Sequence, residues 1–308
     1  MTIVKRCLVS LLMVGALPEY VLPCDVCGCG IGGPYAGLTP FADKAIISLR
    51  YSSTSFDSHL TYSELFRTSE QFYRAEANAR LIVVDRLLLS GTIPFAYNHQ
   101  RIHAQERSLT TSGIGDVVAT VSWLFSSSEI VPTEDPGWRS SLLLSAGISA
   151  PTGQWRYDSS ATDVANANFQ TGSGSWDPIV SMLATYRNDD VGVQGLVLGR
   201  LPTRNPNGYK FGTSLVVNIG AFYVASLDSW AMVPRCDMSF ERSSMNDANG
   251  RAIAETGGYA FALAPAMDVR WKDILTTFSI WVPVYQTYGG GALRSGPRYS
   301  MSMGILIP

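Results

Sequence analysis

Three cysteines near the start of the chain form its most chemically pointed cluster. Cys24, Cys27 and Cys29 lie within one short segment that also contains several glycines. Thiolates at this spacing can close on one soft metal ion, copper or zinc, although three ligands are one fewer than a closed zinc site uses. In an oxidising compartment two of the thiols could instead form a disulfide, and Cys24 could carry a lipid. The sequence leaves these three roles open.

The residues around this cluster indicate export. Lys5 and Arg6 precede an apolar stretch from Cys7 to Leu17, which is the pattern of a signal peptide. We therefore expect residues 1–22 to be a signal peptide and residues 23–43 to form a periplasmic Cys/Gly-rich segment. Residues 44–308 would form the remaining domain.

That domain begins a pattern that is clearest between residues 71 and 98. Apolar side chains alternate there with polar and charged ones, so one face of an extended strand is apolar and the other carries charge. The apolar face of the first arm contains Tyr73, Ala75, Ala77, Ala79, Leu81 and Val83, and its other face contains Arg74, Glu76, Asn78 and Arg80. The pattern predicts a long antiparallel hairpin with a tight turn near Asp85. Its arms are long enough for tilted strands to cross a bilayer, which takes about nine to eleven residues.

The same alternation recurs along the rest of the chain. We predict about twelve strands, at residues 44–56, 70–83, 86–99, 114–126, 138–150, 174–187, 190–201, 208–225, 229–241, 257–270, 273–286 and 297–307. Long and short connections alternate between them, and Ser127–Gly137 is the exception among the short ones. Short turns at one end and long loops at the other are typical of bacterial outer-membrane barrels. The predicted fold class is therefore all-β, a transmembrane antiparallel up-and-down barrel in the outer membrane of a Gram-negative bacterium.

Composition excludes several other classes. The chain has 308 residues, a formal net charge of −2 and only 16% charged residues, so nothing favours a nucleic-acid partner. No apolar stretch of about eighteen residues follows the N-terminal segment, which excludes a helical membrane protein. The expected partners are membrane lipid and a small solute, and the oligomeric state is undetermined.

If the charged faces line a wet lumen, their residues are candidates for selectivity. These are Arg50, Arg74, Glu76, Arg80, Asp116, Asp177, Arg200, Arg235 and Arg270. Rings of charged side chains select solutes in pores, while structural ion pairs would use the same residues. Cys236 lies between Met232 and Met238 on an apolar face, where we expect a buried or lipid-facing hydrophobe.

Four short motifs occur in a characteristic order: Cys24-Asp25-Val26-Cys27-Gly28-Cys29-Gly30, Ser112-Gly113-Ile114-Gly115-Asp116, Pro151-Thr152-Gly153 and Gly172-Ser173-Gly174-Ser175-Trp176-Asp177. In this respect the chain resembles outer-membrane transporters of Bacteroidetes-type bacteria, a group similar to the family named for the MetA pathway of phenol degradation. The resemblance implies a barrel through which small molecules, polar or apolar, cross the outer membrane. From the residues alone, the glycines mark junctions between loops and strands.

Catalysis is the weakest hypothesis. An outer-membrane hydrolase needs a serine and a histidine within hydrogen-bonding distance and a third group that orients them. The three histidines, His59, His99 and His103, fall at strand ends or in loops. The first hypothesis is therefore a passive channel or transporter and not an enzyme. Metal binding by the cysteines is the second hypothesis and a hydrolase the third. No cofactor is expected beyond that soft metal ion.

Overall fold

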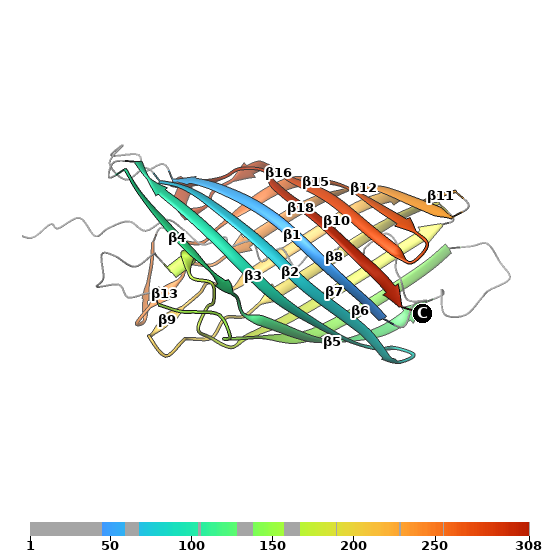
Figure 1. The fold of residues 1–308 in the computed structure, drawn as a ribbon, viewed down its shortest axis with the longest axis horizontal. Helices are drawn as coiled ribbons and strands as arrows, with labels where there is room; N and C mark the ends of the chain where they lie inside the picture. The colour runs from blue at the N-terminus through green and yellow to red at the C-terminus, as the bar shows by residue number, and fades with distance from the viewer. Residues whose placement is uncertain are drawn as a thin grey trace, which may run out of the picture.

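Twelve long antiparallel strands form a closed barrel in the computed structural model, which describes residues 45–58, 68–103, 106–127, 138–156, 167–188, 190–227, 229–254 and 256–307. Each strand pairs with the next one along the chain, and β1 pairs with β18 to close the ring, as the blue and red strands of Figure 1 show. The twelve long barrel strands, called staves below, are β1 (Ala45–Ser58), β2 (Thr68–Val84), β3 (Leu87–Ile102), β5 (Val117–Ser127), β6 (Trp138–Ala150), β7 (Asp177–Asn188), β8 (Val191–Arg200), β10 (Ser214–Tyr223), β12 (Trp230–Ser243), β15 (Gly258–Trp271), β16 (Ile274–Gln286) and β18 (Arg298–Ile307). The predicted fold class is confirmed.

The two faces of the barrel wall have opposite character. On β1, Leu49 points outward and is 68% exposed, whereas the adjacent Ser48 points inward and is 3% exposed. Large apolar side chains cover the outside of the other strands in the same way, while serines, threonines and charged groups are buried inside. Within the described ranges, the buried apolar residues form three small clusters rather than one core. This inversion of a soluble fold matches a barrel whose outside meets lipid.

Aromatic side chains gather at both ends of the outer apolar band. The rings of Trp230 and Trp271 stack at 5.6 Å beside the short turns. Tyr73 lies between Tyr51 and Tyr97 towards the long loops, with ring centroids 6.4 and 6.1 Å away. Girdles of this kind mark the two interfaces of a membrane barrel. Among the described residues, no helix is long and apolar enough to span a membrane.

The long-loop end contains more structure than the sequence predicts. The predicted loop at residues 100–113 is mostly a hairpin, because β3 continues to Ile102 and pairs there with β4 (Arg107–Ile114). The predicted strand at 208–225 is interrupted, so that β9 (Tyr209–Lys210), β10 and β11 (Ala225–Leu227) are separate. β9 pairs with β13 (Asp247–Ala248), which pairs with β14 (Arg251–Ala252). The other small elements are β17 (Leu293–Ser295) and the 3-10 helices η3 (Ala167–Phe169) and η4 (Gly289–Gly291).

The strand that follows β3 is interrupted in the middle of the wall, because β4 ends at Ile114 and β5 begins at Val117. β3 pairs with β5 up to Thr92 and with β4 from Phe95 onward, and Pro94 lies at the change of partner. Proline has no N–H to donate to a sheet ladder, so it suits such a break. Its carbonyl accepts a hydrogen bond from the Gly115 N–H at 2.8 Å. The break places Asp116 between β4 and β5, rather than within one strand as the sequence suggests.

The inside-out wall predicts opposite outcomes for arginine on its two faces. Leu49→Arg places a charge in the outer apolar band, where it costs about 2–4 kcal/mol near the middle of a bilayer. We expect this variant to assemble poorly, measured as the fraction of folded barrel recovered after refolding into lipid vesicles. Ser181→Arg, on the inner face, is the control and should refold like the original protein. Equal yields for both variants would contradict the assignment of faces.

Candidate functional site: the barrel lumen

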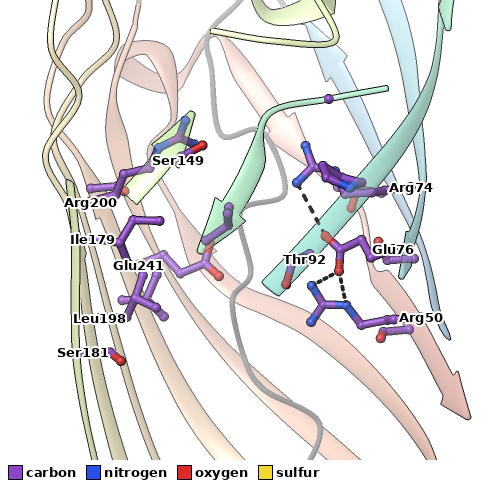
Figure 2. Close-up of a pocket in the computed structure, with 18 of the residues that line it drawn as sticks. Arg50, Arg74, Glu76, Thr92, Ser149, Ile179, Ser181, Leu198, Arg200 and Glu241 are labelled. Atoms are coloured by element: carbon purple, nitrogen blue, oxygen red, sulfur yellow. Dashed lines mark hydrogen bonds and ion pairs between the residues drawn. The ribbon is translucent and has the colours of Figure 1, made fainter. Parts of the chain in front are cut away.

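A central cavity of about 560 Å³ lies inside the barrel and is lined by inward-facing residues of all the main strands and of the loop after β6. The lining is rich in serine, threonine and asparagine, with arginines and carboxylates arranged in pairs. Figure 2 shows two of its sides, with Arg50, Arg74, Glu76 and Thr92 on one and Arg200 on the other. The charged faces of the strands therefore point into the lumen, as predicted.

The first ion-paired cluster joins β1 and β2. Arg50 donates from Nε to Glu76 Oε2 at 2.6 Å, and its terminal nitrogen also contacts that oxygen. Arg74 Nη1 lies 3.9 Å from the other carboxylate oxygen. Glu76 is 5% exposed, and the side chains of Arg50 and Arg74 are 14% and 28% exposed. The carboxylate therefore lies close to the wall while the guanidinium groups are nearer the water.

The second cluster lies at the long-loop end of β7 and β8. Arg200 Nε donates to Asp177 Oδ2 at 3.1 Å, and the terminal nitrogen makes a second contact with the same oxygen. The other oxygen of Asp177 accepts from the Ser175 hydroxyl at 2.7 Å and from the Thr203 N–H at 3.3 Å. Asp177 is fully buried. Its pairing with a lumen arginine was one of the two alternatives that the sequence allowed.

Two further ion-paired clusters join β12 to β15 and to β18. Arg235 lies between two carboxylates, with Nη1 3.1 Å from Asp237 and Nε 3.5 Å from Asp268. Arg298 donates to both oxygens of Glu241 at 2.9 and 3.0 Å.

Arg298 also has two aromatic neighbours. It donates to the Tyr288 hydroxyl at 3.2 Å, and its guanidinium group lies 3.9 Å from the centre of the Trp281 ring. Burial raises the pKa of Tyr288 well above its usual range, so this hydroxyl remains neutral.

Seven of the nine predicted lumen residues line the cavity; Asp177 does not, although its ion-pair partner Arg200 does. Arg270 does not line the cavity either; its Nε donates to the Lys272 carbonyl at 3.0 Å, beside a short turn. Asp116 lines the cavity but bonds to a loop rather than to an arginine. Four further charged residues of the inner wall were not predicted, namely Asp237, Glu241, Asp268 and Arg298. The alternation that identified Arg235 extends to Asp237 and Glu241 two and six residues later, and could have found them.

Asp116 ties the loop after β6 to the barrel wall. Its Oδ1 accepts from the Gly153 N–H at 2.9 Å, and its Oδ2 accepts from the Ser173 N–H at 2.7 Å and the Ser173 hydroxyl at 2.6 Å. The two sides of the loop meet here, because a Cβ on Gly172 would lie 2.6 Å from the Gly153 backbone. Hydrogen bonds to Asp116 thus join three motifs that are separate in the sequence, and we call this group of contacts the Asp116 cluster.

The loop held by the Asp116 cluster narrows the lumen. Asn168, Gln170, Thr171, Gly172 and Ser173 all contribute to the cavity lining. The loop is also held at Phe169, whose carbonyl accepts from the Asn98 side chain at 3.1 Å and from the Thr111 hydroxyl. The Phe169 ring lies 5.1 Å from that of Phe72. Loss of these contacts would widen the path at the long-loop end.

The other candidate chemistry of the sequence is only partly within the described residues. Cys24, Cys27 and Cys29 lie outside them, as do the proposed signal peptide and His59. The described ranges contain no group of three or more histidines, cysteines or acids that could hold a metal ion. Cys236 is exposed on the outer face, as its apolar neighbours predicted.

A serine and a histidine do meet on the outer surface. Ser69 Oγ lies 2.9 Å from His103 Nε2 and donates to Asp57 Oδ1 at 2.8 Å. The carboxylate therefore contacts the hydroxyl and does not orient the imidazole, which is the opposite of the order that a catalytic triad requires. Asp57 and His103 are exposed, and Ser69 is partly buried. The arrangement is a surface hydrogen-bond chain, and it adds no support to the hydrolase hypothesis.

No family model matches the chain, and neither does any curated protein. Among solved structures, the fold is similar to that of an outer membrane channel from Pseudomonas putida F1. That alignment has 14% identity and a TM-score of 0.63 and covers 86% of this chain and 96% of the other. The beta domain of the Bordetella autotransporter Brka aligns at 10% identity with a TM-score of 0.53, over 86% and 100% of the two chains. The likeness is one of fold, and that fold is the outer-membrane β-barrel.

Proposed function

We propose that this protein is a passive channel of the bacterial outer membrane through which small solutes cross along the lumen. The observation that carries the proposal is the pairing of an apolar outer band with a polar, ion-paired inner wall around an internal cavity. Such a wall stabilises water and polar solutes inside a structure whose outside meets hydrocarbon. The similarity in fold to an outer membrane channel supports the same reading.

Ion conductance tests this proposal directly. The purified protein, inserted in planar bilayers of phosphatidylcholine in potassium chloride, should give discrete current steps. Protein unfolded before addition is the control and should give none. If the folded barrel inserts, as judged by protease protection in vesicles, but carries no current, the channel proposal is wrong.

A second candidate function comes from the thiol cluster. We propose that Cys24, Cys27 and Cys29 hold one copper or zinc ion, because their spacing suits soft-metal ligation. Metal analysis of the protein purified from membranes should then give about one ion per chain. The variant with all three cysteines changed to serine should lose the metal while conductance stays the same. Protein that is purified without metal, with two of the three cysteines joined in a disulfide, would exclude this role.

A further inference from the structure

We propose that the lumen selects small amphipathic anions, solutes that carry a carboxylate or similar anionic group on a compact apolar body. The inference rests on the channel function proposed above and names the class of solute that the channel takes. It comes from two parts of the lumen wall, one rich in guanidinium groups and one apolar, that face each other across the cavity.

The cationic part of the wall belongs to β1 and β2. The charged residues that these two strands contribute to the cavity lining are Arg50, Arg74, Arg80 and Glu76, so three cations and one anion give a formal charge of +2. Glu76 is more deeply buried than the guanidinium groups of Arg50 and Arg74. A solute in the lumen therefore meets N–H donors before it meets the carboxylate. Guanidinium groups bind carboxylates with strong, directional hydrogen bonds.

The apolar part of the wall belongs to β7, β8 and β10. Its inward positions include Ile179, Leu183, Leu196, Leu198 and Val216, where other strands place serine, threonine or asparagine. Leu183 pairs with Leu196 across the two strands, so these side chains form one continuous patch. Apolar groups that line a wet cavity gain free energy when an apolar solute displaces the water beside them.

The two parts lie on opposite sides of the ring. β1 and β8 are separated by six steps in either direction around the twelve staves, so they face each other across the lumen. Figure 2 shows Ile179 and Leu198 on one side of the cavity and Arg50, Arg74 and Glu76 on the other. A solute with an anionic group on one side and an apolar body on the other can contact both at once.

The size of the cavity agrees with such a solute. Its volume of about 560 Å³ lies within the range of small-molecule sites, roughly 300–1,000 Å³. Chloride or acetate can use only the cationic part, and a neutral apolar molecule only the apolar part. An organic cation of the same shape would meet the net positive charge of β1 and β2. Benzoate is therefore a suitable probe, with acetate and benzylammonium as its matched comparisons.

Permeability ratios in planar bilayers test the inference. Reversal potentials are measured with sodium chloride on one side and either sodium benzoate or sodium acetate on the other, and the two values should show benzoate favoured over acetate by more than their mobilities in water allow. Arg74→Gln should lower the benzoate preference roughly tenfold, because a charge-assisted contact is lost. Arg101→Gln is the matched control and should change nothing, since Arg101 is exposed on the outer face of β3 and does not line the cavity.

A second variant tests the apolar part of the wall. Leu196→Ser should abolish the difference between benzoate and acetate and leave the ratio of chloride to sodium permeability as it was. If benzoate and acetate permeate equally in the original protein while potassium chloride conducts, the selectivity inference is wrong and the channel function stands.

The solute inference can still be tested if the channel function fails. Absence of any current overturns the channel function. Saturation-transfer NMR on the protein in nanodiscs then still decides the inference, because binding needs no open path. Signal from benzoate that falls in Arg74→Gln, with less signal from benzylammonium, would support the assigned recognition. Equal signals from the two probes would overturn it.

Discussion

Replacing Asp116 by alanine is expected to release the loop after β6 and to widen the lumen without unfolding the barrel. The carboxylate accepts three hydrogen bonds from Gly153 and Ser173, and each bond to a charged acceptor contributes about 1.5–3 kcal/mol. The staves are held by their own ladders, so the wall should persist. Single-channel conductance in potassium chloride should therefore rise, and the loop should become a site of rapid proteolysis.

Two further variants are compared with Asp116→Ala, one as an intermediate and one as a control. Asp116→Asn keeps one acceptor oxygen but loses the charge, so its conductance should lie between those of the original protein and Asp116→Ala. Asp57→Ala removes an exposed carboxylate at the same end of the barrel, where it accepts only from Ser69 among the contacts seen. It should leave conductance and proteolysis unchanged. Unaltered conductance in Asp116→Ala would show that the Asp116 cluster does not limit the width of the lumen.

Replacing Asp177 by asparagine is expected to cause a large loss of stability in the wall. Asp177 is fully buried, and its partner Arg200 would be left as a cation without its counter-charge. Breaking a buried ion pair on one side costs about 3–5 kcal/mol. The side chain of Arg200 is 17% exposed to the lumen, so we expect a loss near the lower end of that range. Urea unfolding in lipid vesicles, followed by tryptophan fluorescence, measures it.

The double variant Asp177→Asn/Arg200→Gln separates charge from packing. Removing both charges leaves no unpaired ion, so much of the lost free energy of unfolding should return. Ser175 and Thr203 can still donate to the amide oxygen of the asparagine. A double variant as unstable as the single one would mean that the packing of Asp177, and not its charge, stabilises the wall.

The strand pattern made most of the fold predictable from the sequence. A period of two persists over ten or more residues in each stave, and the charged faces could lie only in a lumen once the apolar faces were assigned to lipid. All twelve predicted strands correspond to staves; eleven differ by a few residues at their ends, and the one at 208–225 is interrupted. Arg50, Glu76 and Arg200 were found because they interrupt apolar runs at the inward parity.

The long-loop end was not predictable by the same reasoning. Asp116 bonds to backbone groups 37 and 57 residues away, and no local pattern encodes such a contact. The interruption of residues 208–225 likewise depends on pairing of β9 with β13 from a distant loop. Gly172 was interpreted as a flexible junction, whereas the structure uses it for close backbone approach to Gly153. Loops take their shape from tertiary contacts that periodicity does not describe.

The pairing of β1 with β18 has a consequence for how the chain folds. These strands join residues 45–53 to residues 299–307, so the ring cannot close until the last stave has formed. Until then both edges present unpaired N–H and C=O groups and a continuous apolar face, which favour aggregation in water. Folding of this barrel should therefore be slow and dominated by a late, non-local step. A lipid surface or a holding partner that shields the open edges would raise the yield more than any single stabilising substitution.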